Sequence, residues 1–125
     1  MTLPQDLKYT KEHEWVKVNG ETVTVGITDH AQDQLGDIIF VEFPDLDKEI
    51  EKDESFGTIE AVKTVADLFA PISGTVTEIN ETLEDSPESV NTDPYGAGWF
   101  VKVSIADAGE LDELMTAEQY GELIR

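Results

Sequence analysis

The chain has 125 residues, of which 39% are hydrophobic, enough for one compact domain over residues 1–125. Its 28 acidic residues outnumber 8 basic ones and give a net charge of −20. Nucleic-acid binding needs a basic surface that neutralises phosphates, and anionic membranes repel such a chain, so both are excluded as partners. There is no cysteine, which excludes disulfides, thiolate metal sites and cysteine nucleophiles.

The start of the sequence and its charge bear on where the protein works. MTLPQDLKYT lacks the apolar segment of a secretory signal and the Arg/Ser-rich character of a transit peptide. No apolar run approaches the ~18–20 residues of a membrane span. We therefore expect a cytoplasmic protein. The acidity has two compatible readings, which are solubility (including adaptation to high salt) and steering toward basic patches on partner proteins.

The first half of the chain reads as strands around one short helix. EWVKVNGETVTVGI (14–27) contains two β-rich runs joined by Asn19-Gly20, which is a strong hairpin signal. In TDHAQDQLG, Thr28 or Asp29 is placed to cap a helix that Gly36 ends. DIIFVEF (37–43) then reads as a buried strand.

The second half holds further strands and a helical tail. We expect a solvated loop over 44–54, a second hairpin over 55–70, a strand over 74–79, a loop with a helical turn over 81–98, and a last strand over 99–105. The segment from about 107 to 125 reads as helical, with Thr116-x-x-Gln119 as a capping box. Many short strands separated by turns predict a mainly β protein, an antiparallel β sandwich or flattened barrel with short peripheral helices and a C-terminal helix.

The second hairpin contains the near-palindrome IEAVKTVADL (59–68), with Lys63-Thr64 at its centre. A two-residue turn there places mirrored residues opposite one another. Most of these pairs stabilise a hairpin, but two opposed acids destabilise it. The predicted pairs are Val62–Val65, Ala61–Ala66, Glu60–Asp67 and Ile59–Leu68.

The lysine in this turn needs an explanation of its own. A turn selected for stability alone would carry Asn-Gly or Asp-Gly. Schiff-base catalysis requires an ammonium destabilised by burial or by neighbouring cations, whereas Lys63 is expected to be exposed among carboxylates. Catalysis by Lys63 is therefore not expected. From the hairpin alone, Lys63 is either a solvated turn residue or a site that another enzyme modifies.

The sequence around this lysine resembles the attachment hairpin of the biotinyl and lipoyl carrier family. GTIEAVKTVADLFAPISGTV (57–76) has the tip lysine in mirrored flanks, followed by a proline and a glycine before the next strand. Biotin carriers favour methionine on both sides of the lysine. The neighbours here are Val62 and Thr64, which favours lipoate.

Other stretches resemble one subfamily, the H proteins of the glycine cleavage system. The resemblance spans roughly residues 7–123, with one minor departure at Ala61, where the family often has serine. The matching stretches are KYTKEHEWV (8–16), VGITDHAQDQLGDIIFVE (25–42), VNTDPYGAGWF (90–100) and ELDELMTAEQY (110–120).

The resemblance implies a lipoylated carrier that is not an enzyme, with lipoate in amide linkage on Lys63. Such a carrier takes the aminomethyl group of glycine from the pyridoxal-phosphate-dependent glycine decarboxylase to the tetrahydrofolate-dependent aminomethyltransferase. It then presents the reduced dithiol to dihydrolipoamide dehydrogenase, and a lipoyl ligase or lipoyltransferase attaches the lipoate. A monomer fits this role. A lipoyl reservoir that donates lipoate to other proteins is the alternative, and an autonomous enzyme using Lys63 is a third hypothesis.

Further residues are candidates for docking and recognition. H proteins are expected to fold the loaded arm against their own surface, and Glu14 and Asp67 are the candidate partners of its ammonium group, forming an ion pair at a half-exposed cleft. Their other readings are an ordinary strand residue and a solubilising residue near the turn. Glu60 is a candidate for recognition of the hairpin. His30 is a further candidate, although a structural hydrogen bond explains it equally simply.

The remaining aromatic and imidazole side chains are expected to be mainly structural. Trp15, Trp99 and Phe100 read as core anchors, and His13 reads as a surface residue. For Tyr95, in DPYGAG, contact with a partner and a role in turning the chain are both open.

Overall fold

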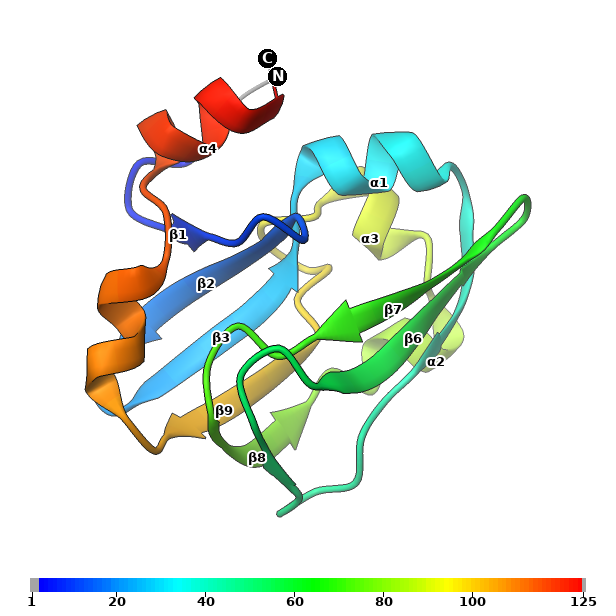
Figure 1. The fold of residues 1–125 in the computed structure, drawn as a ribbon. Coiled ribbons are helices and arrows are strands. Elements are labelled where there is room, and N and C mark those ends of the chain that lie inside the picture. Colours follow the sequence, from blue (N-terminus) through cyan, green and yellow to red (C-terminus); the bar gives the residue numbers. More distant parts are fainter. Residues whose placement is uncertain (1–2, 125) are drawn as a thin grey trace.

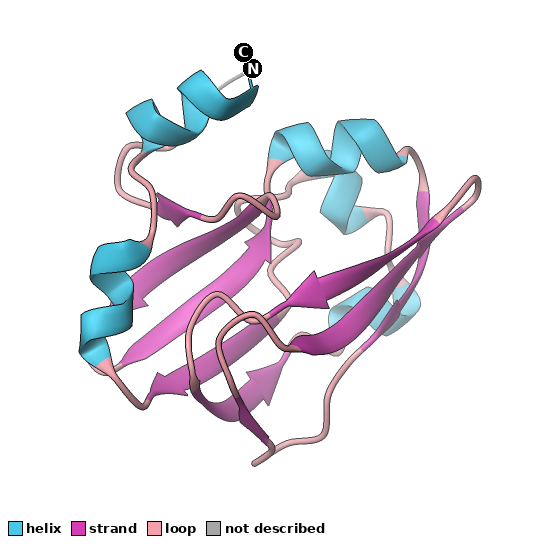
Figure 2. Cartoon of the chain, in the orientation of Figure 1, coloured by secondary structure: helices cyan, strands magenta, loops and turns pink. Residues whose placement is uncertain are grey.

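Two antiparallel sheets pack face to face in the computed structural model, which describes residues 3–124 (Figures 1 and 2). One sheet has the strand order β1-β2-β3-β9-β8-β5 and the other β4-β6-β7. The strands are β1 (Lys8–Tyr9), β2 (Glu14–Asn19), β3 (Thr22–Ile27), β4 (Ile38–Glu42), β5 (Glu49–Ile50), β6 (Ser55–Ala61), β7 (Val65–Phe69), β8 (Gly74–Ile79) and β9 (Val101–Ile105). The predicted β sandwich is confirmed.

The helices lie around the sheets, also as predicted (Figure 2). They are α1 (Asp29–Leu35), α2 (Thr82–Asp85), α3 (Ser89–Thr92), the 3₁₀ helix η1 (Ala108–Glu113) and α4 (Ala117–Ile124). The segment 81–98 thus holds two helical turns, α2 and α3, where one was expected, and the expected loop 44–54 contains the short strand β5. Among the described residues, no helix has the length and apolarity needed to cross a membrane.

Alternation of side chains along the strands builds the core between the two sheets. In TVTVGI, Val23 and Val25 point inward, and they pair across β3 and β9 with Val103 and Val101. All four are completely buried, because successive side chains of a strand point to opposite faces. The small sheet contributes Ile38, Val41, Ile59 and Leu68 to the same apolar cluster.

The first hairpin forms, but its turn lies one residue later than predicted. Asn19 pairs with Thr22, so the turn residues are Gly20 and Glu21 rather than Asn19 and Gly20. Gly20 is therefore the first central residue of the turn, and its φ is 67. Such a glycine is typical of the type II′ turn, in which a positive φ is required at that position.

Strand β4 departs from the prediction of a buried strand. Ile38 and Val41 are buried, but Ile39 and Phe40 are 51% and 50% exposed. The pairing of β4 with β6 shifts register between Ile38 and Phe40. A bulge of this kind adds one residue to a strand and re-aims its side chains. The continuous apolar run therefore does not mark a strand that is buried on both faces.

The limits of helix α1 agree with the sequence. The hydroxyl of Thr28 accepts a hydrogen bond from the Ala31 amide at 3.1 Å, and Gly36 follows the helix with φ 81. At the other end of the chain, the capping box of α4 is also confirmed. The Gln119 amide donates to the Thr116 hydroxyl at 3.2 Å, and the Thr116 amide donates to the Gln119 side chain at 2.9 Å.

Helix α4 covers the outer end of the large sheet through a second apolar cluster. The rings of Tyr9 and Tyr120 stack with their centroids 4.9 Å apart, and Trp15 belongs to the same cluster. Trp15 and Phe100 are buried as predicted. Trp99 is only half-buried, with the Lys102 ammonium 5.2 Å from its ring centroid.

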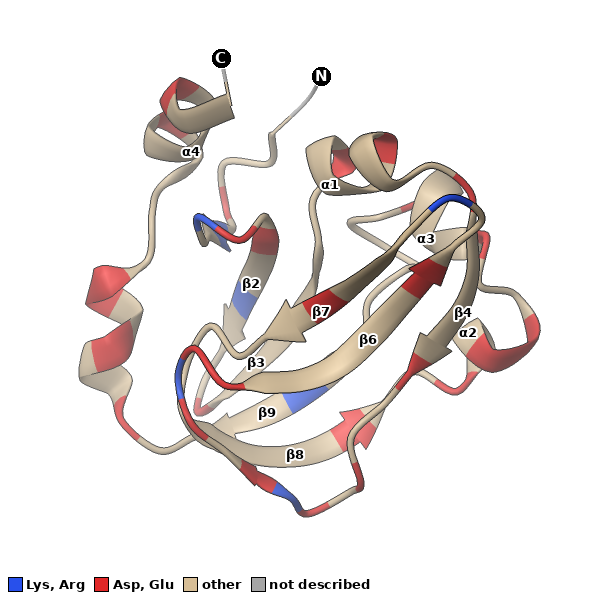
Figure 3. Ribbon diagram, turned by 45° about the vertical axis from the view of Figure 1, so that its right-hand side comes forward, with Lys and Arg blue, Asp and Glu red and all other residues tan. Residues whose placement is uncertain are grey.

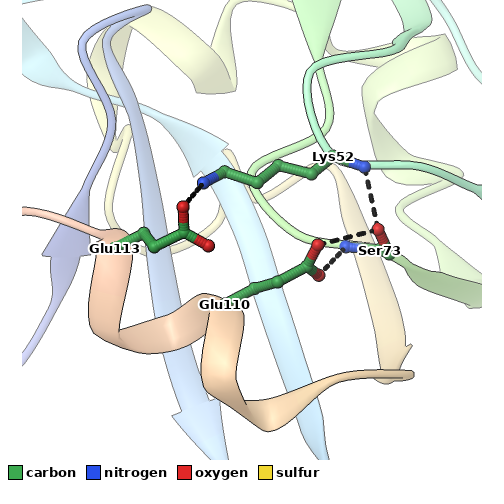
Figure 4. Close-up of polar contacts among 4 residues, drawn as sticks. All are labelled: Lys52, Ser73, Glu110 and Glu113. Carbon is green, nitrogen blue, oxygen red and sulfur yellow. Dashed lines mark hydrogen bonds and ion pairs between the residues drawn. The ribbon is translucent and has the colours of Figure 1, made fainter.

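The 3₁₀ helix η1 is tied to the strands by a polar cluster (Figure 4). The Glu110 carboxylate accepts hydrogen bonds from the Ser73 amide at 2.7 Å and from its hydroxyl at 3.0 Å. The Ser73 hydroxyl in turn accepts from the Lys52 amide at 3.0 Å, and the Lys52 ammonium lies 3.0 Å from the Glu113 carboxylate. These contacts hold the tail of the chain against the loops that join β5 to β6 and β7 to β8.

Candidate functional site

Lys63 lies at the exposed tip of the β6–β7 hairpin, which projects toward the end of helix α1 (Figure 1). Glu60 pairs with Val65, and the Ala61 amide donates to the Thr64 carbonyl at 2.8 Å. The two central residues of the turn are therefore Val62 and Lys63. The predicted turn at Lys63-Thr64 is displaced by one residue, but the lysine remains at the tip.

This displacement changes every predicted pair in the hairpin. Glu60 does not oppose Asp67, because Asp67 pairs with Thr58, and Ile59 pairs with Ala66. The physical reason is the period of a strand. Shifting the pairing by two residues keeps each side chain on its face of the sheet, so the alternation of buried and exposed residues fits both registers even though the mirrored pairs are lost. The expected repulsion between Glu60 and Asp67 as an opposed pair is absent.

Backbone contacts hold the tip against the loop that follows α1. The Val62 amide donates to the Asp37 carbonyl at 3.1 Å. The Lys63 side chain passes close to Gly36, since a Cβ built on that glycine lies 3.3 Å from Lys63 Cε. Asn91 of α3 secures the same loop, accepting from the Ile38 amide at 2.9 Å and donating to the Gly36 carbonyl at 2.8 Å.

Replacement of Gly36 by alanine is expected to destabilise the fold by about 2 kcal/mol. With φ 81 and ψ −156, Gly36 occupies a backbone region that is almost restricted to glycine, and the added Cβ would press on the Lys63 side chain. Urea unfolding of Gly36→Ala measures the loss. Gly20→Ala is the matched control, because Gly20 also has a positive φ but a Cβ there meets nothing within 4 Å. A loss no larger than that of the control would contradict this account.

A cavity of about 140 Å³ lies between the hairpin, helix α1 and the start of β2. Its wall is mainly apolar, and Asp67, on β7, stands on its rim four residues beyond Lys63. At about 3.3 Å per strand residue, Asp67 is roughly 13 Å along the strand from the lysine. The lining residues are Glu12, His13, Glu14, Ile27, Ala31, Gln34, Leu35, Ile59, Ala66, Asp67 and Leu68.

Glu14 is buried at the inner end of this cavity, with only 2% of its surface exposed. Its Oε1 accepts from the Thr10 hydroxyl at 3.0 Å and its Oε2 from the Phe69 amide at 2.9 Å. Burial raises the pKa of Glu14 to about 8, although both hydrogen bonds act in the opposite direction. The negative charges of Glu12 and Asp53 make smaller contributions to the same rise in pKa. Glu14 is thus neither an outward strand residue nor a half-exposed carboxylate.

A second cavity, of about 290 Å³, meets the first at Glu14. It lies under η1 and the β5–β6 loop, and it includes Lys52 and Glu113 of the polar cluster in Figure 4. Its lining is Tyr9, Thr10, Lys11, Glu12, Glu14, Lys52, Asp53, Phe69, Ala70, Pro71, Glu113, Leu114 and Met115. Glu14, together with Glu12, therefore lines both the apolar cavity and the one that contains charged side chains.

The two histidines lie together, with ring centroids 4.9 Å apart. His13 contributes to the cavity lining, whereas His30 is not among the lining residues. The Nδ1 of His13 is 2.8 Å from the Tyr120 hydroxyl, which is also 2.8 Å from the Thr28 hydroxyl. Burial and the neighbouring His30 lower the pKa of His13. The geometry thus places His13 nearer to the site than His30, the reverse of the order expected from the sequence.

Comparison with known proteins shows which family has this site. The family model described as "Glycine cleavage H-protein" matches residues 7–125. The chain belongs to the glycine cleavage H-protein family. The glycine cleavage system H proteins of Staphylococcus carnosus (strain TM300) and of Staphylococcus saprophyticus are each 60% identical to it over 124 residues, covering 99% of this chain and 98% of theirs.

A solved structure supports the same assignment. The crystal structure of a glycine cleavage system H protein from Mycobacterium marinum matches with a TM-score of 0.89 at 41% identity, over 96% of this chain and 97% of that one. The family resemblance seen in the sequence is confirmed. Members of this family are the lipoyl carriers of the glycine cleavage system, and they carry rather than catalyse.

The charges of this family member surround the tip lysine with acids. Figure 3 shows basic colour at the tip of the β6–β7 hairpin, a short acidic band on each of the two strands, and further acidic colour in the neighbouring loops. Glu60 and Asp67 are both exposed, on the outer side of β6 and β7. An acidic surface of this kind favours encounter with partners that present basic patches.

Several residues at the site were not selected from the sequence. Thr10 and the Phe69 backbone hold Glu14, and Asn91 holds the loop beside Lys63. Tyr95 is structural in this fold, because its hydroxyl accepts from the Asp29 amide at 3.0 Å at the start of α1. The contacts of Phe69, Asn91 and Tyr95 join segments that are distant in sequence. Thr10 lies only four residues before Glu14, but this spacing is not a known sequence motif.

Proposed function

We propose that this chain carries lipoate in amide linkage on Lys63. The observation that carries the proposal is an exposed lysine on a firmly held tip, beside an apolar cavity that ends in a buried carboxyl group. A solvated turn residue needs neither feature. Acylation removes the positive charge of the ammonium, and Lys63 is in no ion pair among those found within residues 3–124.

The residues of the apolar cavity fit the lipoyl group. An apolar cavity of about 150 Å³ is large enough for a benzene ring, and the dithiolane ring is of similar size. The Lys63 stem and an octanoyl-length chain together exceed the distance of roughly 13 Å to Asp67. Ile27, Leu35 and Leu68 offer apolar contacts to such an arm. When bound, lipoate supplies a disulfide that accepts the aminomethyl group of glycine.

Glu14 and Asp67 are the groups that we propose to hold the ammonium end of the loaded arm. Asp67 is exposed at the rim, and Glu14 lies at the inner end of the cavity. The raised pKa of Glu14 keeps its carboxyl group mainly protonated at neutral pH in the unloaded protein. A cation that enters favours the ionised form. Docking is therefore expected to release a proton from Glu14, while Asp67 provides a screened attraction of about 1 kcal/mol or less.

The carrier role defines the partners that we propose. They are the pyridoxal-phosphate glycine decarboxylase, the tetrahydrofolate-dependent aminomethyltransferase, dihydrolipoamide dehydrogenase, and a lipoyl ligase or lipoyltransferase. Each must reach either Lys63 or the end of an arm attached to it, and the projecting hairpin leaves that region open (Figure 1). We further propose that the chain acts as one domain, because residues of both sheets share one apolar cluster.

Reconstitution tests this function. The chain is expressed with lipoate present, its intact mass and modified peptide are determined, and it is mixed with the other three components of the system. We expect one lipoyl group on Lys63 and glycine-dependent formation of NADH. A lipoylated chain that forms no NADH but passes its lipoyl group to lysines of other proteins would establish the reservoir function instead.

A further inference from the structure

The bulge in β4 exposes apolar side chains next to the tip lysine. Within residues 3–124, seven large hydrophobic side chains are well exposed, and four of them lie on β4 or at the hairpin tip. These are Ile39, Phe40, Val62 and Val65, with exposures of 51%, 50%, 72% and 60%. Exposed hydrophobic side chains that cluster in this way differ from the scattered single residues that are normal on a protein surface.

Strand pairing places two of these side chains in one row with an acid. Phe40 pairs with Glu60, and Glu60 pairs with Val65. Directly opposed residues of antiparallel strands share a face, with Cβ atoms about 5 Å apart, so Phe40 and Val65 are about 10 Å apart with Glu60 between them. We call the surface formed by Ile39, Phe40, Glu60, Val62 and Val65 the tip patch.

The core does not require the tip patch. Ile38, Val41, Ile59 and Ala61 supply the inward side chains of the same strands, and all are buried. Strand β4 is also an edge strand of its sheet. Exposed apolar residues on an edge strand favour unwanted pairing between chains, which proteins usually avoid. Their presence in a chain with 28 acidic residues therefore indicates a partner that covers them.

We propose that the tip patch is the docking surface for the enzyme that attaches lipoate to Lys63. This inference rests on the function proposed above. In the attachment step, Nζ forms a bond to the acyl carbon of lipoate activated as an acyl adenylate, AMP leaves with the electron pair of the broken bond, and the ammonium gives up two of its three protons, so that the amide keeps one N–H. The enzyme must therefore enclose Nζ itself. Val62 is the neighbour of Lys63 in the turn, and Glu60 and Val65 form the next strand pair after Ala61 and Thr64, which close the turn.

The other partners have less need of this surface. They act on the dithiolane, which stands at the far end of an octanoyl-length chain, whereas the tip patch lies at the base of that chain. The chemistry of the patch also describes the surface that covers it. We expect the enzyme to have an apolar recess for Phe40, a basic group opposite Glu60, and basic residues around the rim, because acidic residues lie on β6, β7 and the neighbouring loops (Figure 3).

The test compares rates of lipoylation. The unmodified chain is incubated with a lipoate–protein ligase, lipoate and ATP, and intact mass is followed over time. We expect Phe40→Ser and Ile39→Ser each to lower the rate about tenfold at low chain concentration, since central apolar anchors dominate such interfaces. Leu46→Ser is the matched control, because Leu46 is 53% exposed but lies outside the patch, and its rate should stay within about twofold of wild type. Circular dichroism and urea unfolding verify that each variant folds.

A second readout does not depend on the reaction. Titration of the ligase with each unmodified chain should show weaker binding for Phe40→Ser and Ile39→Ser, in proportion to their slower rates. Unchanged rates and binding in both variants, with wild type modified on Lys63, would overturn this inference alone. Absence of modification in wild type would overturn the proposed function as well. Normal lipoylation of both variants followed by slow glycine-dependent NADH formation would assign the patch to another enzyme of the glycine cleavage system. That result would also overturn this inference.

Discussion

Replacement of Lys63 by arginine is expected to abolish lipoylation completely while leaving the free energy of unfolding within about 0.5 kcal/mol of wild type. The turn is held by the backbone bonds Ala61 N–H to Thr64 O and Val62 N–H to Asp37 O, neither of which uses the lysine side chain. Arginine keeps the charge beside Gly36, but its guanidinium is not acylated. Intact mass after expression with lipoate measures the loss.

A matched control separates this loss from a general effect of lysine replacement. Lys17 is exposed on strand β2, far along the chain from the hairpin, and Lys17→Arg should gain the full lipoyl mass. The chain contains seven lysines. A Lys63→Arg protein that still gained this mass would show that one of the other six is the attachment site.

Replacement of Glu14 by glutamine is expected to remove a large part of the dependence of stability on pH. The pKa of Glu14 is 4.5 in its ordinary state and about 8 in the folded chain, so the folded chain holds this proton more tightly. The resulting stabilisation is complete below about pH 4.5, falls by about 1.4 kcal/mol for each pH unit above it, and is lost once the pH exceeds about 8. Glutamine resembles the protonated acid, and its amide can bond to both Phe69 N–H and the Thr10 hydroxyl.

Urea unfolding of wild type and Glu14→Gln from pH 5 to pH 9 tests this expectation. The variant should become the more stable of the two as the pH rises, with a difference that grows by several kcal/mol across the range. Glu12→Gln is the control, because Glu12 is an exposed neighbour of the same cavity. Parallel stability curves for wild type and Glu14→Gln would show that Glu14 is ionised in the folded chain.

Local signals in the sequence predicted those elements that local contacts determine. Helix α1 begins after Thr28 and ends before Gly36 because its cap and its positive-φ residue lie within the helix's own segment. The capping box of α4 is local in the same way. The tip position of Lys63 also follows from the sequence, since either register of the hairpin leaves it in the turn.

The features that were mispredicted depend on contacts between distant segments. Both hairpin turns are displaced by one residue, and the second displacement is stabilised by Asp37, from the loop after α1. The bulge that exposes Phe40 arises from the pairing of β4 with β6, which the apolar run DIIFVEF does not reveal. Glu14 is buried because β7 supplies the Phe69 amide, 55 residues away in the sequence. Periodicity within one strand carries no information on such partners.

The hydroxyl group of Tyr120 has a consequence for the order in which this molecule is completed. It bridges His13 to Thr28, the residue that caps α1, and a ribosome releases it long after both of these residues. The β6–β7 hairpin and the tip patch precede Tyr120 by more than fifty positions. Its hydroxyl group bonds to His13 and Thr28, and within residues 3–124 no side-chain hydrogen bond joins it to the hairpin. During synthesis, therefore, the lysine and its surroundings emerge first, and the bridge between His13 of the cavity wall and the cap of α1 forms only when helix α4 follows.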